Sequence, residues 1–200
     1  MYEHCEIEVV DNVLPEENFK SLEEFVLSPK FPWHWEKGTI NDRTVNHGSF
    51  DTPQMVTPIY ISGNQHIDAS GKDMRIPSQV LQYPEFEMIT THALDKAKQE
   101  FGYELLWRIK ANLLMPYPNS PMHHPRHADT NNTDGNYVTI NYYVNDSDGD
   151  TFLFPRGQAP IQITPKANSA VIFDAKMMHC SSNPINSDRR VVINAVVKIS

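Results

Sequence analysis

Three residues in the C-terminal half of the chain have the types and the spacing of a metal site: His127, Asp129 and His179. Residues two apart on a strand point to the same side, so His127 and Asp129 can offer an imidazole and a carboxylate to one point. His179 follows an apolar run and can complete the set. Two histidines and one carboxylate that leave half of an octahedron open suit non-heme iron(II) and its chemistry with oxygen. The spacing therefore predicts an iron-dependent oxygenase site.

Length and composition limit what else the chain can be. At 200 residues with 40% apolar residues, it can bury a core and lies in the size range of one domain. We expect a single domain over 1–200, with an N-terminal elaboration of helices and loops over 1–102 and the core that carries the metal site over 103–200. The net charge of −8, from 17 Lys+Arg against 25 Asp+Glu, argues against a nucleic-acid partner, which normally meets a basic face.

Cysteine usage and hydropathy bear on the compartment. Cys5 and Cys180 have no paired spacing and predict no disulfide framework. The start of the chain does not read as a secretory leader, so a reducing cytoplasm is the expected location. No stretch approaches the roughly 20 apolar residues that cross a bilayer, so we expect no membrane span.

The first half of the chain predicts one strand, two helices and a loop-rich region. Glu6 to Val13 is typical of a strand, and the helix after Pro15 begins with acidic residues, which favour a helix N-terminus. A second helix is expected from Glu85 to Phe101, ended by Gly102. The region from Asn41 to Pro77 is rich in turn formers and predicts loops with short strands. The segment Phe31 to Gly63 is expected near the pocket, where it could serve as a lid.

The second half changes to β-branched and aromatic runs separated by turn residues. Strands are expected over Leu105–Met115, Tyr137–Val144, Thr151–Phe154, Ile161–Ile163, Ser169–Phe173 and Arg190–Ile199. Helices followed by at least six short strands predict a mainly β fold with flanking helices and a double-stranded β-helix, or jelly-roll, core.

Two longer segments carry a resemblance to a known family. The run Tyr117-Pro118-Asn119-Ser120 leads into Arg126-His127-Ala128-Asp129, and Val138 to Asn145 ends in Tyr-Tyr-Val-Asn. In this order, they resemble the iron(II)- and 2-oxoglutarate-dependent dioxygenases, in particular the prolyl 4-hydroxylase-like branch. The resemblance implies iron(II), 2-oxoglutarate and O2 as cofactor and cosubstrates. It also implies that His127, Asp129 and His179 hold the iron, and that Tyr117 and Tyr143 contact 2-oxoglutarate.

The cosubstrate needs a cation for its distal carboxylate. A guanidinium matches a carboxylate with two parallel hydrogen bonds, and both Arg189 and Arg190 lie in the window where the family places its arginine. Adjacent strand residues face opposite ways, so only one of the two can point inward. The run that starts at Arg190 fits the family's Arg-aromatic-x-Ile-polar pattern and favours Arg190. Asn194 would then share its inward face.

The reaction implied by the resemblance is hydroxylation of a substrate C–H bond with release of succinate and CO2. A prolyl or other peptidyl side chain is the leading substrate, a small molecule follows, and nucleic acid is least favoured for this acidic chain. Since iron needs neutral imidazoles, activity is expected to fall as the pH drops toward about 6. Asp148-Gly149-Asp150 stands where relatives often have a Gly-Gly pair, which leaves the shape of the neighbouring loop open.

Two other classes of function remain open at the sequence level. A cupin-type metal-dependent isomerase or hydrolase explains the metal set but not the arginine window, and dependence on 2-oxoglutarate would exclude it. A non-catalytic jelly-roll binding module would keep the fold without binding a divalent metal.

Overall fold

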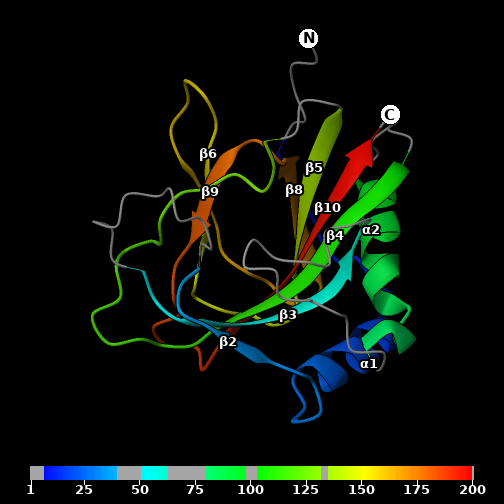
Figure 1. Cartoon of the computed structure of the whole chain (residues 1–200), viewed down its shortest axis with the longest axis horizontal. Helices are drawn as coiled ribbons and strands as arrows, with labels where there is room; N and C mark the ends of the chain where they lie inside the picture. Colours follow the sequence, from blue (N-terminus) through cyan, green and yellow to red (C-terminus); the bar gives the residue numbers. More distant parts are fainter. Residues whose placement is uncertain (1–6, 40–50, 63–79, 98–102, 132–134, 200) are drawn as a thin grey trace.

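Two antiparallel sheets form the body of the chain in a computed structural model that describes residues 7–39, 51–62, 80–97, 103–131 and 135–199 (Figure 1). The larger sheet has the order β1 (Glu8–Val10), β8 (Ser169–Asp174), β5 (Asn136–Tyr143), β10 (Arg190–Ile199), β4 (Tyr103–Leu114), β3 (Gln54–Ile61) and β2 (His34–Glu36). The smaller sheet has the order β7 (Ile161–Ile163), β6 (Thr151–Phe154) and β9 (Met178–Ser181). The expectation of a mainly β fold is confirmed.

Two helices cover the outer face of the larger sheet (Figure 1). They are α1 (Glu16–Val26) and α2 (Glu85–Lys96), with a short 3-10 turn at Val80–Gln82 before α2. Both carry acidic residues in the first turn, which favours the positive end of the helix dipole. The last residues of the second predicted helix, 98–101, lie outside the described residues. Flanking helices are therefore confirmed at both expected places.

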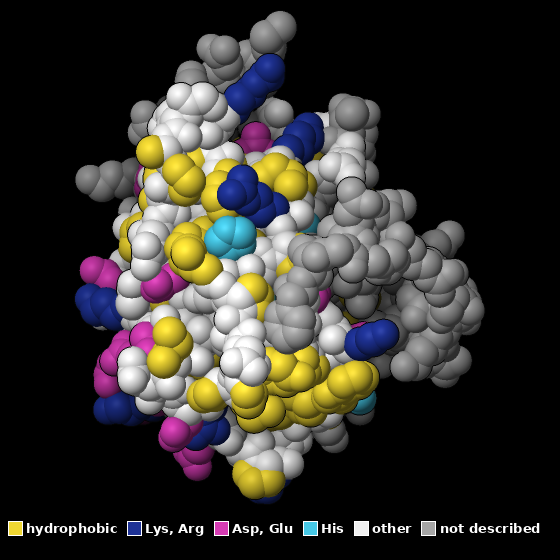
Figure 2. Space-filling model, turned by 90° about the vertical axis from the view of Figure 1, so that its left-hand side faces the viewer, with side chains coloured by type: hydrophobic (Ala, Val, Ile, Leu, Met, Phe, Trp, Pro, Cys, Tyr) yellow, Lys and Arg dark blue, Asp and Glu magenta, His cyan; other side chains and the backbone are white. Residues whose placement is uncertain are grey.

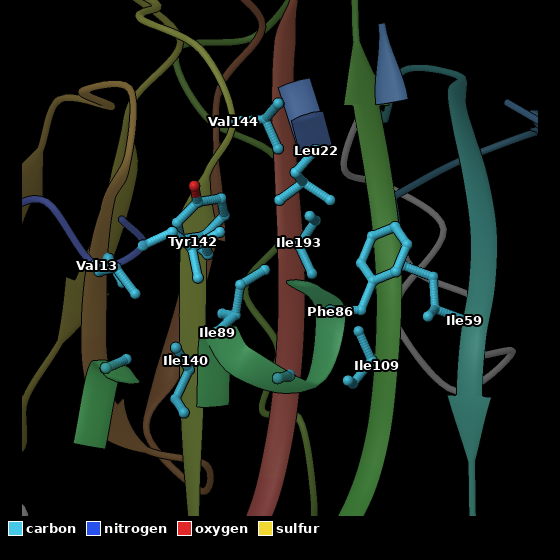
Figure 3. Close-up of a cluster of buried hydrophobic side chains, with 14 of the residues drawn as sticks. Val13, Leu22, Ile59, Phe86, Ile89, Ile109, Ile140, Tyr142, Val144 and Ile193 are labelled. Atoms are coloured by element: carbon cyan, nitrogen blue, oxygen red, sulfur yellow. The ribbon is translucent and has the colours of Figure 1, made fainter. Parts of the chain in front are cut away.

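The central strands bury both of their faces. On β10, Val191, Ile193 and Ala195 point to the helices and join the main apolar core, while the residues between them point to the smaller sheet. Figure 3 shows this outer core, where Leu22 of α1 and Ile89 of α2 lie over Ile140, Ile193 and Ile109 of the sheet. The inner face of the same strands carries polar residues. The functional residues described below come from that face.

The structure differs from the sequence-based expectation at two strands. All of β3 lies in the region from Asn41 to Pro77, for which loops with short strands were expected, and it is longer than expected because Pro58 interrupts its pattern. A register irregularity between Pro58 and Tyr60 accommodates the proline, which cannot donate to the ladder. The short strand β9 was not predicted either, although it carries His179. The first 102 residues thus contribute β1, β2 and β3 to the larger sheet.

Within the described ranges, no helix is both long and apolar enough to span a membrane.

The outer core generates a stability prediction. Ile193 is fully buried under the helices, so Ile193→Ala should lower the free energy of unfolding by about 2–5 kcal/mol through lost burial and a cavity. The same substitution at Ile185, which is 79% exposed, should change it by less than about 0.5 kcal/mol. Urea unfolding at constant m-value measures both, and equal effects would contradict the packing described here.

Candidate metal and cosubstrate site

His127, Asp129 and His179 come together at one edge of the smaller sheet. One potential ligand atom from each lies within 4.8 Å of those of the other two. His127 and His179 exchange backbone hydrogen bonds of 2.9 and 2.8 Å, which form an isolated bridge rather than a regular strand. The Asp129 amide donates to the carbonyl of Ala175 in the turn before β9. These backbone contacts hold the loop against β9 and place the three side chains around one point.

Each imidazole places one ring nitrogen within 4.8 Å of the Asp129 carboxylate, where a metal ion could be bound. The Nδ1–H of His179 donates to the carbonyl of Met177 at 2.9 Å, which leaves the Nε2 lone pair directed to the side of Asp129, 3.5 Å away. The Nδ1 atom of His127 is buried and lacks a hydrogen-bond partner within the described part of the chain. A ring nitrogen of His127 lies within 4.8 Å of an oxygen of Asp129 and a ring nitrogen of His179, so the three side chains can share one metal ion. The donor set therefore fits iron(II).

Asp129 is held by hydrogen bonds to both carboxylate oxygens. Arg108 donates to Oδ1 at 2.6 Å in an ion pair, and Thr139 and Asn194 donate to Oδ2 at 2.7 and 3.0 Å. Arg108 also donates to Oδ1 of Asn194 at 2.7 Å, and Asn194 donates to Asn141 at 2.8 Å. The network fixes the orientation of the carboxylate before any metal binds.

The electrostatics keep Asp129 and His127 in the protonation states that a metal requires. Burial opposes ionisation of Asp129, but nearby positive charge, first that of Arg108 and then those of His179 and Lys110, outweighs it and holds its pKa well below the ordinary range. Burial, followed by the charge of His179, lowers the pKa of His127 to about 4. Asp129 is therefore an anion and His127 neutral at physiological pH.

A cavity extends from the three residues to Arg190, and its lining includes Arg190 and Asn194. Arg190 is 4% exposed. Its Nε–H donates to the carbonyl of Gly149 and its Nη2 to Oγ1 of Thr151, both at 2.7 Å. Tyr143 donates to the same Thr151 oxygen at 2.9 Å, and burial raises the pKa of Tyr143 to about 12. The cavity thus ends at a buried, oriented guanidinium.

The predicted cosubstrate residues occupy different positions relative to this cavity. Arg190 and Asn194 line it, and Tyr143 stands behind Thr151. Arg189 does not line it among the described residues. Tyr117 is 42% exposed and lies in the loop after β4, also outside the lining. The role assigned to Tyr117 stays a prediction.

The Asp-Gly-Asp turn explains how Arg190 fits. A Cβ on Gly149 would lie 2.9 Å from the Arg190 side chain and from the backbone of Ser182 and Pro184. The carboxylate of Asp148 accepts backbone N–H groups of residues 185–187, which ties the following loop down. A glycine is therefore required at position 149, because the Arg190 side chain and the neighbouring backbone approach it closely.

Four residues of the site were missed at the sequence level: Arg108, Lys110, Thr139 and Thr151. Arg108, Lys110 and Asn112 alternate with apolar residues along β4, a pattern that ordinarily indicates a solvent-facing side. The same alternation on β10 was interpreted as inward-facing only because of the arginine motif.

Comparison with known proteins identifies the class. Residues 114–198 match the family model of the 2OG-Fe(II) oxygenase superfamily. No curated protein matches the chain significantly. The match spans less than half of the chain and includes His127, Asp129 and His179. Together with the shared fold, it confirms the resemblance to the 2-oxoglutarate- and iron(II)-dependent oxygenases found in the sequence.

Solved structures share the jelly-roll fold. A prolyl-4-hydroxylase from Pseudomonas putida has 14% identity and a TM-score of 0.57, with 96% of this chain and 91% of that chain covered. A Trichoplax adhaerens prolyl hydroxylase, solved with a peptide fragment of hypoxia inducible factor, has 17% identity, a TM-score of 0.59 and coverages of 96% and 83%. A 2OG-Fe(II) oxygenase from Burkholderia pseudomallei has 11% identity, a TM-score of 0.63 and coverages of 96% and 85%. The jelly-roll prediction is confirmed.

The cofactors follow from the family, which uses iron(II), 2-oxoglutarate and O2. One structure with this fold, the epimerase SnoN, was solved with Fe3+ and alpha ketoglutarate. The expectation for the cofactors is confirmed.

The network around Asp129 predicts an effect on metal affinity. Thr139→Val keeps the shape but removes a donor to the carboxylate, so affinity for Mn(II) or Fe(II) should fall about 10-fold. Thr57→Val is the matched control, because Thr57 is equally buried but donates to the Pro32 carbonyl. Anaerobic metal titration should show a loss for Thr139→Val alone; equal affinities would show that this hydrogen bond does not position the ligand.

The low pKa of His127 predicts a pH dependence of stability. Because the folded pKa is about 4 and the ordinary value 6.5, the unfolded chain binds more protons between these pH values. The stability of the metal-free protein should therefore fall as the pH is lowered from about 6.5 to about 4. Urea unfolding should show a shallower fall for His127→Asn than for the exposed control His34→Asn. His127 itself stays neutral at pH 6, so it does not produce the loss of activity expected there from ordinary histidines.

Proposed function

We propose that the chain hydroxylates a C–H bond of its substrate in a reaction coupled to oxidation of 2-oxoglutarate. The observation that carries the proposal is one cavity with His127, Asp129 and His179 on one side and the buried guanidinium of Arg190 at its end. 2-Oxoglutarate has a 2-oxo acid group at one end and a carboxylate at the other. The three candidate metal ligands and Arg190 are separated along the cavity in the way that these two groups require. In this reaction one oxygen atom of O2 goes to the product and the other to succinate, with release of CO2.

His127, Asp129 and His179 are the proposed metal ligands. When bound there, iron(II) would supply the chemistry with O2 and 2-oxoglutarate. The protein's own part is to hold Asp129 through Arg108 and Thr139, and to direct Nε2 of His179 by the hydrogen bond at Nδ1. The low side-chain exposure of His179 and Asp129, 5% and 2%, also limits access of water to the reacting centre.

Arg190 is the proposed partner of the distal carboxylate of 2-oxoglutarate. Its guanidinium is oriented by Gly149 and Thr151, and the Thr151 hydroxyl can contact the same carboxylate. Tyr143 acts through Thr151 in this arrangement. Asn194, which the sequence placed with the cosubstrate, is better supported as a residue that orients Asp129.

A prolyl or other peptidyl side chain is the proposed substrate. The support is a shared fold with prolyl hydroxylases, one of which was solved with a peptide. Figure 2, viewed from the side of the smaller sheet, shows several groups of hydrophobic side chains at the surface, next to Lys and Arg side chains. Such a mixed surface suits an extended peptide. The epimerase SnoN has the same fold, so a small-molecule substrate is the alternative outcome.

We also propose that residues 1–200 form one catalytic domain in the cytoplasm. The larger sheet combines β1, β2 and β3 with strands from the second half, which supports a single folding unit. The one cysteine in the described ranges, Cys180, is free and buried, as a reducing compartment allows.

Anaerobic titration of the iron(II)-loaded protein with 2-oxoglutarate tests the proposal. Chelation should give the visible charge-transfer band of a 2-oxo acid on iron(II). Arg190→Met should weaken 2-oxoglutarate binding by at least about 30-fold, because it removes a buried charge-assisted contact worth about 2 kcal/mol or more. Arg189→Met, which changes the neighbouring residue outside the cavity, should bind as the parent protein does.

The outcomes separate the remaining classes. Unchanged iron affinity in Arg190→Met would show that the metal site is intact. Iron binding without a charge-transfer band in the parent protein would reject the proposal and favour a cupin-type isomerase or hydrolase. Failure to bind any divalent metal would favour a binding module.

A further inference from the structure

Lys110 lines the cavity on the inward face of β4, at the level of the metal ligands. Its neighbour on β10 is Asn194, which contacts Asp129, and its neighbour on β3 is Pro58. Asn112, two residues further along the strand, lines the same cavity. His127, Asp129 and His179 line the same cavity as Lys110, so its charge acts on the candidate metal ligands. The proposed function assigns no role to either side chain.

Lys110 differs from the other two cations of the site, because it has no partner. Arg108 forms an ion pair with Asp129, and Arg190 donates to Gly149 and Thr151. In the described part of the chain, the Lys110 ammonium makes no hydrogen bond and no ion pair, and neither does the Asn112 side chain. Lys110 is partly buried, and a charged side chain that lines a cavity is normally paired. These donors therefore face the cavity without an acceptor from the protein.

The balance of charge points to an anionic ligand. Arg108, Lys110 and Arg190 supply three positive charges, of which Asp129 balances one and Asp150 acts on Arg190 from the surface side. Iron(II) and the 2-oxoglutarate dianion cancel each other, so one positive charge is left at Lys110. Burial, followed by repulsion from Arg108, lowers the pKa of Lys110 to about 8. A bound carboxylate would remove this penalty.

We infer that Lys110, with Asn112 beside it, forms a second carboxylate-binding site in this cavity, next to the metal ligands. The inference rests on the proposed function and deepens it. Two ligands carry the required group: the 1-carboxylate of 2-oxoglutarate, which keeps one oxygen free when it chelates iron, and a carboxylate of the substrate. Arg190 and Lys110 would then hold two different carboxylates along one cavity.

The test compares the parent protein, Lys110→Met and the matched control Lys20→Met, whose lysine is exposed on α1. Each is loaded with iron(II) without oxygen and titrated with 2-oxoglutarate, followed by the charge-transfer band. The saturated proteins are then titrated with acetate, used as a simple carboxylate probe, and the shift of the same band is recorded. Lys110→Arg, which keeps the positive charge, should retain binding within about threefold of the parent protein.

The 2-oxoglutarate titration and the acetate titration distinguish between the two carboxylates that the site could bind. A loss of 2-oxoglutarate affinity of about 10-fold or more in Lys110→Met alone assigns the site to the 1-carboxylate. Unchanged 2-oxoglutarate affinity, with an acetate-induced shift in the parent protein that Lys110→Met lacks, assigns it to the substrate. If Lys110→Met and the parent protein agree within twofold in both arms, the inference is overturned. The absence of any band in the parent protein would instead reject the proposed function.

Thermal stability gives a readout independent of activity. Removal of an unpaired, desolvated charge should raise the melting temperature of the ligand-free protein, by about 2–4 °C for each kcal/mol gained. Lys20→Met should leave it unchanged. A lower melting temperature for Lys110→Met would show that Lys110 has a stabilising partner, which contradicts the inference.

Discussion

The central strands β4, β5 and β10 have both faces buried, and the site depends on this constraint. Their outer face is apolar and packs under α1 and α2, where it supplies the hydrophobic free energy that stabilises the sheet. The inner face is then free to carry polar side chains, provided that each finds a partner. The helices therefore make it energetically possible for the opposite face of the same sheet to hold a polar, reactive cavity.

The carboxylate of Asp129 is the centre at which these inner residues meet. It lies on a loop, but it accepts hydrogen bonds from Arg108 on β4, Thr139 on β5 and Asn194 on β10. Three neighbouring strands of the larger sheet thus orient Asp129. The other two residues of the set depend on β9, which carries His179 and pairs with His127. A loop that would otherwise fluctuate is fixed from both sheets. This preorganisation lets a metal bind with little rearrangement.

The Arg190 end of the cavity depends on the short turn at Asp148-Gly149-Asp150. Gly149 allows Arg190 to approach closely, and Asp148 ties residues 185–187 to the same turn. Thr151 then connects the guanidinium to Tyr143. The turn that departs from the Gly-Gly pair of relatives therefore serves to build the buried end of the cavity. Its two carboxylates stabilise loops rather than contact the metal set.

The sequence by itself determined the strand alternation, both helices, the resemblance to the family and the three residues of the candidate metal site, because these follow from periodicity and from short motifs. It indicated short strands around β3 but not its eight-residue length, because a proline interrupts the pattern, and it did not delimit β9, which is too short to show a period. Only the tertiary structure decided that the polar face of β4 points inward. Arg108, Lys110 and Asn112 alternate just as solvent-facing residues do, and burial on both sides of a strand arises only when the second sheet and the helices pack against it.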